Sequence, residues 1–228
     1  MKRREFTAAL SLPALPLLAL SPQVAHAGLS EGDAASGVRA ALERGALAAV
    51  SLLGKTDGFL GNPQVRIPLP GFLQDASKLL RATGQGRKLD ELITAMNRAA
   101  EAAVPMAKPL FVSTVKAISV EDALKVVRGG ATSVTDYFAS KTRTPLAEKF
   151  LPIVTQATEK VSLAERYNAV AARAQGLGLM KGDEGNVQQY VTRRALDGLF
   201  LMIGEEEKKI RADPVKTGSA ILKKVFGG

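Results

Sequence analysis

Two residue types that carry much of enzyme chemistry are almost missing from this 228-residue chain. It contains no cysteine and a single histidine, His26. Without a thiolate or an imidazole in the folded part, a Ser-His-Asp triad, a cysteine nucleophile and an ordinary zinc site are all excluded. Tryptophan is absent as well, and with it a common platform for stacking sugar rings. We therefore expect neither a metal site nor a cofactor.

The lone histidine falls within the pattern of an export signal. A basic start is followed by an apolar stretch, residues 8–20, and then by Ala25-His26-Ala27, which is an A-x-A cleavage site. That stretch is shorter than the roughly twenty residues that a transmembrane helix needs. We expect residues 1–27 to be a cleaved signal peptide, residues 28–228 to form one helical domain, and the mature protein to be periplasmic, with no transmembrane span.

The export route has two candidates. Arg3-Arg4-Glu5-Phe6 matches the core of the twin-arginine pattern. The apolar stretch is rich in leucine and no basic residue stands near the cleavage site, features that suit the general secretory route. We expect twin-arginine export, with the general route as the alternative.

The charge of the mature chain is positive but carries little information about partners. Cleavage removes three basic residues and one acidic residue, which lowers the formal net charge from +9 to about +7. Such a charge could favour anionic lipid or a cell-wall polymer, or serve solubility alone. Nucleic acid is not expected, because the compartment is wrong and the few aromatic residues are not interleaved with basic ones.

Apolar residues recur at helical spacing along nearly the whole mature chain. The longest β-branched alternation is Val65 to Leu69, which allows one short extended segment at most. Capping and breaking residues, among them Thr144-Pro145 and the capping box that starts at Ser162, mark the helix boundaries. The fold class predicted is all-α. The expected helices cover 33–53, 88–104, 105–118, a short piece ending at Gly129-Gly130, 145–161, 163–174, 187–211 and a last helix that follows Asp213-Pro214 and reaches Phe226.

The long C-terminal helix contains a stretch, residues 195–203, that is apolar on nearly every side. This predicts a helix buried all round. Asp197 is its only charge, and Arg194 or Arg193 lies within reach as a partner. We interpret Arg194 and Asp197 as a structural charge pair, with a pocket-lining carboxylate as the alternative. Gly198 in mid-helix indicates a close approach by another backbone.

A Pro- and Gly-rich loop, residues 57–73, carries seven large apolar side chains. It can be an extended segment that lies across the helical core. It can also be one wall of an apolar ligand groove, because loops rarely carry so many apolar residues unless they cover something. The candidate ligand-binding residues on the second interpretation are Asp57, Phe59, Asn62, Arg66 and Phe72.

Two charged motifs give weaker signals. The run Glu205 to Lys209 suits a solvated helix end, because neighbouring carboxylates on a helix point about 100° apart rather than into one cleft. The stretch Gly84-Gln85-Gly86-Arg87-Lys88 is similar to an anion-binding helix start but lacks the full phosphate-loop pattern.

Seven stretches of the mature chain carry a resemblance to known proteins. They are residues 53–63, 65–70, 96–101, 136–138, 195–200, 205–208 and 222–227. Together they resemble a bacterial family of exported proteins known as domain of unknown function 4197. The resemblance covers nearly all of the mature chain and implies a periplasmic helical domain, without an activity or catalytic residues.

Two classes of function remain open. The favoured one is a non-enzymatic periplasmic module that binds a lipid or other apolar small molecule, or a periplasmic protein. The alternative is a carboxylate-dependent hydrolase of the cell wall. Binding is favoured over catalysis, since no isolated acid stands in a recognisable cleft motif.

Overall fold

The computed structural model describes residues 29–117, 119–121, 123–176 and 186–227, and the side chains of 72, 174 and 175 are outside that description. The expected signal peptide therefore lies outside the described residues. Within them, every regular element is helical, which confirms the all-α fold class. The elements are α1 (Glu31–Leu53), α2 (Gly71–Leu80), a kinked turn η1 (Arg81–Gln85), α3 (Gly86–Met106), α4 (Lys108–Ala117), α5 (Ala123–Val127), α6 (Ser133–Lys160), α7 (Leu163–Gly176), α8 (Val187–Ala212), a 3₁₀ turn η2 (Val215–Thr217) and α9 (Ala220–Phe226).

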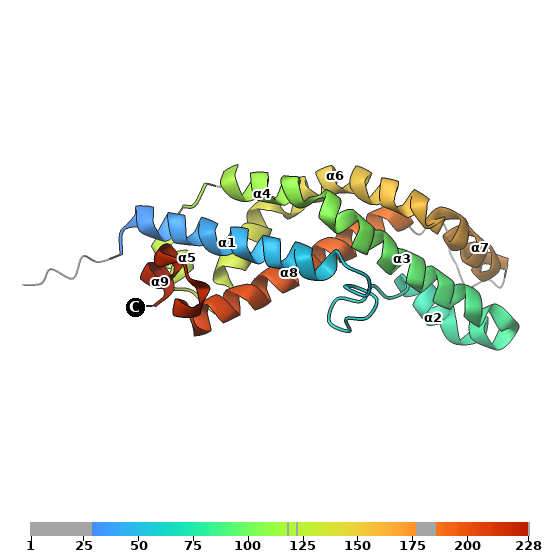
Figure 1. Ribbon diagram of the computed structural model, residues 1–228. Helices are drawn as coiled ribbons and strands as arrows, with labels where there is room; N and C mark the ends of the chain where they lie inside the picture. The colour runs from blue at the N-terminus through green and yellow to red at the C-terminus, as the bar shows by residue number, and fades with distance from the viewer. Residues whose placement is uncertain (1–28, 118, 122, 177–185, 228) are drawn as a thin grey trace, which may run out of the picture.

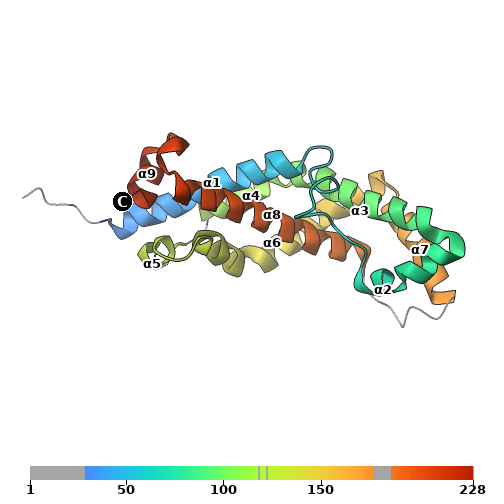
Figure 2. The same ribbon diagram turned by 90° about the horizontal axis from the view of Figure 1, so that it is seen from below.

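The helices form an elongated bundle around α8, which packs along both α1 and α6 (Figure 1). Helix α3 continues the bundle by packing on α6 and α7. Helices α5 and α9 lie at one end with the start of α1, whereas α2, α7 and the start of α3 lie at the other end (Figures 1 and 2). A single apolar core runs through these contacts.

Helix α8 is central but is not buried on every side, which corrects the expectation for residues 195–203. Leu196, Leu199 and Ile203 are buried, whereas Leu201 is 40% exposed and Asp197 is half-buried. The apolar run predicted burial on all sides. An exposed leucine such as Leu201 cannot be told from a buried one in the sequence, so the run does not show that one face of the helix is uncovered. That face reaches solvent since α1 and α6 pack on the other sides.

Helix α6 corrects a predicted boundary. The pair Thr144-Pro145 was expected to open a helix, yet α6 runs from Ser133 to Lys160 through both Pro145 and Pro152. A proline inside a helix removes one backbone hydrogen bond and crowds the preceding turn. The burial of apolar side chains both before and after Pro145 in the sequence outweighs that local penalty. The buried apolar side chains of α6 are Val134, Phe138, Leu146, Phe150, Val154 and Ala157.

Other boundaries differ by smaller amounts. Helix α3 continues through Pro105 to Met106, and the last helix begins only at Ala220, where the Oγ of Ser219 accepts the N–H of Leu222. Helix α7 starts at Leu163 as expected, although Ser162 has φ +50° rather than the extended backbone of an N-cap. Helix α2, residues 71–80, was not predicted.

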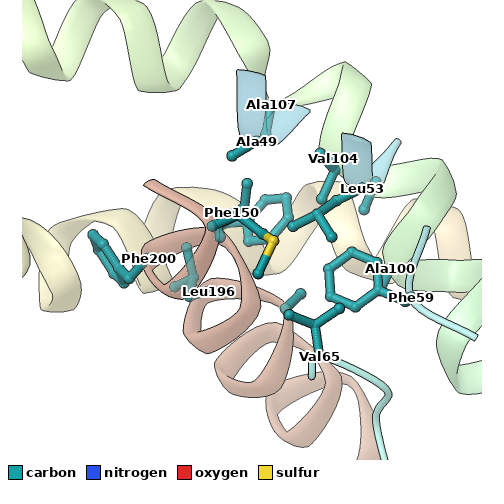
Figure 3. Close-up of a cluster of buried hydrophobic side chains, with 14 of the residues drawn as sticks. Ala49, Leu53, Phe59, Val65, Ala100, Val104, Ala107, Phe150, Leu196 and Phe200 are labelled. Atoms are coloured by element: carbon teal, nitrogen blue, oxygen red, sulfur yellow. The ribbon is translucent and has the colours of Figure 1, made fainter. Parts of the chain in front are cut away.

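The segment between α1 and α2, residues 54–70, crosses the core as non-helical chain (Figure 3). The side chains of Phe59 and Ile67 are completely buried, and Val65 is 7% exposed. A Cβ atom at Gly198 would lie 2.9 Å from Cε1 of Phe59 and 3.2 Å from Cβ of Val65. A close approach exists at Gly198, but the side chains of Phe59 and Val65 make it, and not the backbone that was expected.

Candidate functional site

The apolar side chains of the segment 54–70 face inward. Phe59 and Ile67 are fully buried, and Leu69 is 6% exposed. Leu73, in the first turn of α2, is fully buried as well. In Figure 3 the ring of Phe59 lies among side chains of α1, α3 and α8. Phe59 therefore packs in the core and does not face an open groove. The sequence could not predict this, because it does not show which side of the loop the helices cover. Of the two interpretations of this loop, the extended segment that lies across the core is the one that these residues fit.

Two buried polar side chains of α3 hold the segment in place. The Oδ1 atom of Asn97 accepts the N–H of Ile67 at 2.8 Å, and its Nδ2 donates to the carbonyl of Ile67 at 2.9 Å. The Oε1 atom of Glu101 accepts the N–H groups of Phe59 and Leu60, each at 3.0 Å. These bonds satisfy backbone groups that a non-helical segment would otherwise bury without partners.

The sequence analysis did not predict that Asn97 and Glu101 bind the backbone of this segment. A signal was present, since they stand four residues apart and beside the apolar stripe of α3 that includes Met96 and Ala100. Polar residues at that spacing next to a buried stripe indicate a partner that supplies backbone groups.

The predicted polar anchors lie at the surface and are not brought together. Asp57 is 59% exposed, has φ +64°, and its Oδ1 accepts a bond from Nη2 of Arg98 at 2.9 Å. Asn62 accepts the N–H of Gln64 and so closes a local turn. Arg66 is exposed and its charge helps to lower the pKa of Asp90. The side chain of Phe72 lies outside the described residues.

The Arg194–Asp197 pair exists but is a surface pair. Nη1 of Arg194 lies 3.7 Å from Oδ2 of Asp197, and both side chains are more than 40% exposed. A second arginine, Arg143 of α6, donates from Nη1 to Oδ1 of Asp197 and lies over the ring of Phe200. The pair was expected in the core, and it lies outside because this face of α8 is open.

Glu207 corrects the view that Glu205 to Lys209 is wholly solvated. It is 2% exposed, and its carboxylate accepts the N–H groups of Val134 and Thr135 at 3.0 and 2.8 Å. Arg211 pairs with it at 2.8 Å and also donates to the carbonyl of Val127. Glu207 and Arg211 thus bind the start of α6 and the end of α5 to α8.

Open volume occurs instead between α3, η1 and the junction of α6 with α7. This hollow, the α3–α7 cleft, has a volume of about 780 Å³ and a surface that is mostly carbon. Its lining comes from η1, α3, α7 and a residue that joins α6 to α7. Helix α7 and the start of α3 lie at the same end of the bundle (Figure 1). Its lining residues are Arg81, Gly86, Arg87, Asp90, Glu91, Thr94, Ala95, Arg98, Val161 and Arg166.

Ion pairs cross the α3–α7 cleft from one helix to another. Arg81 binds Asp90 with both terminal nitrogens, at 2.6 and 3.2 Å, and Arg166 of α7 reaches Glu91 at 3.0 Å. The hydrogen bonds with Arg81 lower the pKa of Asp90, and the same bonds raise the pKa of Arg81. Asp90 and Arg81 therefore keep their charges at neutral pH.

Arg98 connects the α3–α7 cleft with the segment 54–70. Its Nη1 donates to Oε2 of Glu101 at 2.6 Å, and its Nη2 binds Asp57. The pair with Glu101, together with Asp57, raises the pKa of Arg98. The predicted loop therefore borders the open volume through one arginine, although its apolar side chains are buried elsewhere.

The start of α3 is part of the cleft wall. The helix begins at Gly86, and its first turn holds Arg87 and Lys88 but no acidic residue. Gln85 precedes it without a side-chain capping bond, and its buried Oε1 has no partner within the described part of the chain. This is the stretch that was similar to an anion-binding helix start in the sequence.

The comparisons with known proteins give a family and nothing more specific. A family model described as "Protein of unknown function (DUF4197)" matches residues 28–227. No curated protein and no solved structure matches the chain. In the described ranges, no cluster of three or more His, Asp or Glu could hold a metal ion. None of the helices described there combines the length and the apolar character needed to cross a membrane.

Proposed function

Because this chain belongs to the DUF4197 family of proteins of unknown function, we propose from its own structure that it is a non-enzymatic binding module of the periplasm. The ligand is an apolar or amphiphilic small molecule, and its site is the α3–α7 cleft. One observation carries the proposal: the cleft has about 780 Å³ of open volume, within the roughly 300–1,000 Å³ that small-molecule pockets occupy.

The surface of the cleft suits such a ligand. Ala95 and Val161 contribute apolar walls, and the aliphatic stems of the arginines extend them. The guanidinium groups stand where a polar end of the ligand would be oriented. Apolar walls with a few charged groups are typical of ligand sites.

The carboxylates of the cleft favour binding over catalysis. A cell-wall hydrolase needs one carboxyl group that stays protonated near neutral pH and acts as general acid. The pKa of Asp90 is shifted in the opposite direction, and Glu91 is held by Arg166. The carboxylate-dependent hydrolase therefore has no supporting observation at this cleft.

Uptake of an uncharged fluorescent probe tests the proposed function. We expect the purified mature chain to bind N-phenylnaphthylamine with enhanced fluorescence. Thr94 is exposed and lines the cleft, so Thr94→Trp should fill the open volume and abolish most of the binding. Ser36→Trp on α1 is the matched control, because Ser36 is also exposed and each hydroxyl donates to the carbonyl four residues earlier at 2.8 Å.

The two variants and the wild type separate the outcomes. Loss of binding in Thr94→Trp with retention in Ser36→Trp supports the cleft as the ligand site. Equal binding by both variants would contradict it. Absence of binding by the wild type would contradict the ligand proposal and leave a helical domain that binds a periplasmic protein.

Export is tested separately from binding. Arg3-Arg4 are replaced by two lysines, which should block export if the twin-arginine route is used. The expected product of the unaltered chain is a periplasmic protein whose first residue is Gly28. Normal export of the lysine variant would contradict the twin-arginine route, and retention of the unaltered chain in the cytoplasm would contradict periplasmic residence.

A further inference from the structure

We infer that the ligand of the α3–α7 cleft carries an oxyanion, a carboxylate or a phosphate, on an aliphatic chain, and that this oxyanion replaces Asp90 at Arg81. The inference rests on the proposed function, because it names the chemical class of ligand for the same site. It follows from the charges of the cleft, from their geometry and from the surface between them.

Positive charge exceeds negative charge in the lining. Arg81, Arg87, Arg98 and Arg166 face two carboxylates, Asp90 and Glu91. Just outside the lining, Arg66 acts on Asp90, whereas Glu101 and Asp57 pair with Arg98. With these neighbours included, five arginines face four carboxylates, and the balance remains positive. An anion that enters the cleft therefore meets a favourable electrostatic potential.

The geometry for an oxyanion is already present in the ion pair between Arg81 and Asp90. The guanidinium of Arg81 binds both carboxylate oxygens of Asp90, which is the fork arrangement that also fits carboxylate and phosphate ligands. The two side chains are 47% and 61% exposed. Exposed pairs contribute little to stability, so Arg81 can change partners without loosening the fold.

The start of α3 adds to the same potential. Its first amide groups have the partial positive charge of a helix N-terminus, and Arg87 and Lys88 stand in that turn without an acid. The buried Oε1 of Gln85 is an acceptor with no partner among the described residues. A bound water would satisfy it, because Gln85 is not among the residues that line the cleft.

The mostly carbon surface of the cleft explains why the ligand is amphiphilic rather than a small anion. Ala95 and Val161 lie in the lining with the stems of the arginines, and they offer no hydrogen bonds to a polar ligand. An aliphatic chain would cover this surface while its oxyanion stays with the guanidinium groups.

Two probes that differ only in charge test the inference. They are a dansyl-labelled undecanoic acid and its methyl ester, titrated against the mature chain. We expect the acid to bind about tenfold more tightly than the ester, since a charge-assisted hydrogen bond adds roughly this factor. Higher ionic strength should weaken the binding of the acid and leave the ester unchanged.

Two substitutions in the same ion pair should act in opposite directions. Arg81→Gln is expected to weaken the binding of the acid about fivefold to tenfold and to leave the affinity for the ester unchanged. Asp90→Asn should strengthen binding of the acid, because it removes the carboxylate that competes for Arg81. Arg143→Gln and Asp197→Asn are matched controls, since they change an exposed Arg–Asp pair between α6 and α8 and should alter neither affinity.

The outcomes distinguish this inference from the proposed function. Equal binding of the acid and the ester would contradict the inference that the ligand carries an oxyanion, but it would still support a ligand-binding module. Binding of neither probe would overturn both. Competition with dodecanoate but not with inorganic phosphate at the same concentration supports an amphiphile, whereas equal competition by phosphate would overturn the aliphatic chain and show a small-anion site.

Discussion

Two buried glutamates, Glu101 and Glu207, organise the parts of this protein that are furthest from ideal helix packing. Each accepts two backbone N–H groups from another segment and pairs with an arginine of its own helix, Arg98 or Arg211. A buried carboxylate without such partners would be strongly destabilising. The carboxylates therefore supply acceptors for buried backbone N–H groups, and the paired arginines stabilise the negative charge that this burial requires.

Removal of the carboxylate of Glu101 should uncouple the segment 54–70 from α3. The variant Glu101→Ala leaves the N–H groups of Phe59 and Leu60 buried and Arg98 without its nearest partner, and we expect a loss of about 3–5 kcal/mol in unfolding free energy. Glu91→Ala, on the same helix but exposed, should cost less than about 1 kcal/mol. Chemical denaturation of both variants measures the difference, and equal losses would show that Glu101 is not an anchor.

Asp197 leads to the opposite expectation. Its side chain is 44% exposed, and its partners Arg143 and Arg194 remain solvated when it is removed. We expect Asp197→Leu to change the unfolding free energy by less than about 1 kcal/mol. A loss several times larger in denaturant titration would mean that this face of α8 is covered in solution.

At the scale of elements, the contact between the segment 54–70 and α8 depends on Gly198. The absence of a side chain there lets Phe59 and Val65 pack directly on the helix. The segment fills a space between α1, α3 and α8 that no helix occupies (Figure 3). Its three prolines reduce the entropy that the unfolded chain loses on ordering.

A methyl group at Gly198 should disrupt this contact. The added Cβ would stand 2.9 Å from the ring of Phe59, so Gly198→Ala is expected to destabilise the fold by about 1–3 kcal/mol despite the better helix propensity of alanine. Gly71→Ala, in α2, is the control, because no atom lies within 4 Å of its added Cβ. Thermal unfolding that ranks Gly71→Ala as the worse variant would contradict the packing described.

At the scale of the whole molecule, the two ends of the bundle are held in different ways. Helix α9 returns to α1, where Val225 packs on Gly37 and Nζ of Lys224 lies 2.7 Å from Oδ2 of Asp33. The opposite end carries the α3–α7 cleft, whose walls are joined by exposed ion pairs. Apolar packing holds α9 closely, whereas the cleft keeps charged groups accessible.

The pair between Asp33 and Lys224 predicts a pH dependence. Hydrogen bonds from Lys224 and Ser30 lower the pKa of Asp33, so the folded state favours the ionised carboxylate. Its stabilisation is therefore fully present at neutral pH and is lost as the pH falls through that lowered pKa, below the ordinary value of about 3.9. Asp33→Asn should lower stability at neutral pH but not in strong acid.

Denaturant titrations at several pH values, with Lys224→Gln and the double variant, check this dependence. The double variant should lose no more stability than either single one, because both remove the same pair. A deficit of Asp33→Asn that persists unchanged in strong acid would show that the pair is not its cause.

The sequence by itself determined the properties that depend on local chemistry. Helical spacing and the capping residues predicted an all-α chain and the starts of α7 and α8 within a residue. The absence of cysteine, together with a single histidine at position 26, limited the chemistry. Gly198 marked a close contact. These follow from interactions between residues a few positions apart, which the order of residues contains directly.

Tertiary structure decided what depends on distant partners. Only packing against α8 shows why α6 continues through Pro145, and only the start of α6 explains the burial of Glu207. The α3–α7 cleft joins residues from η1, α3 and α7, and the pair of Arg166 with Glu91 spans 75 positions. Such sites arise because burial and charge pairing act through space, so sequence spacing alone does not encode which faces remain open.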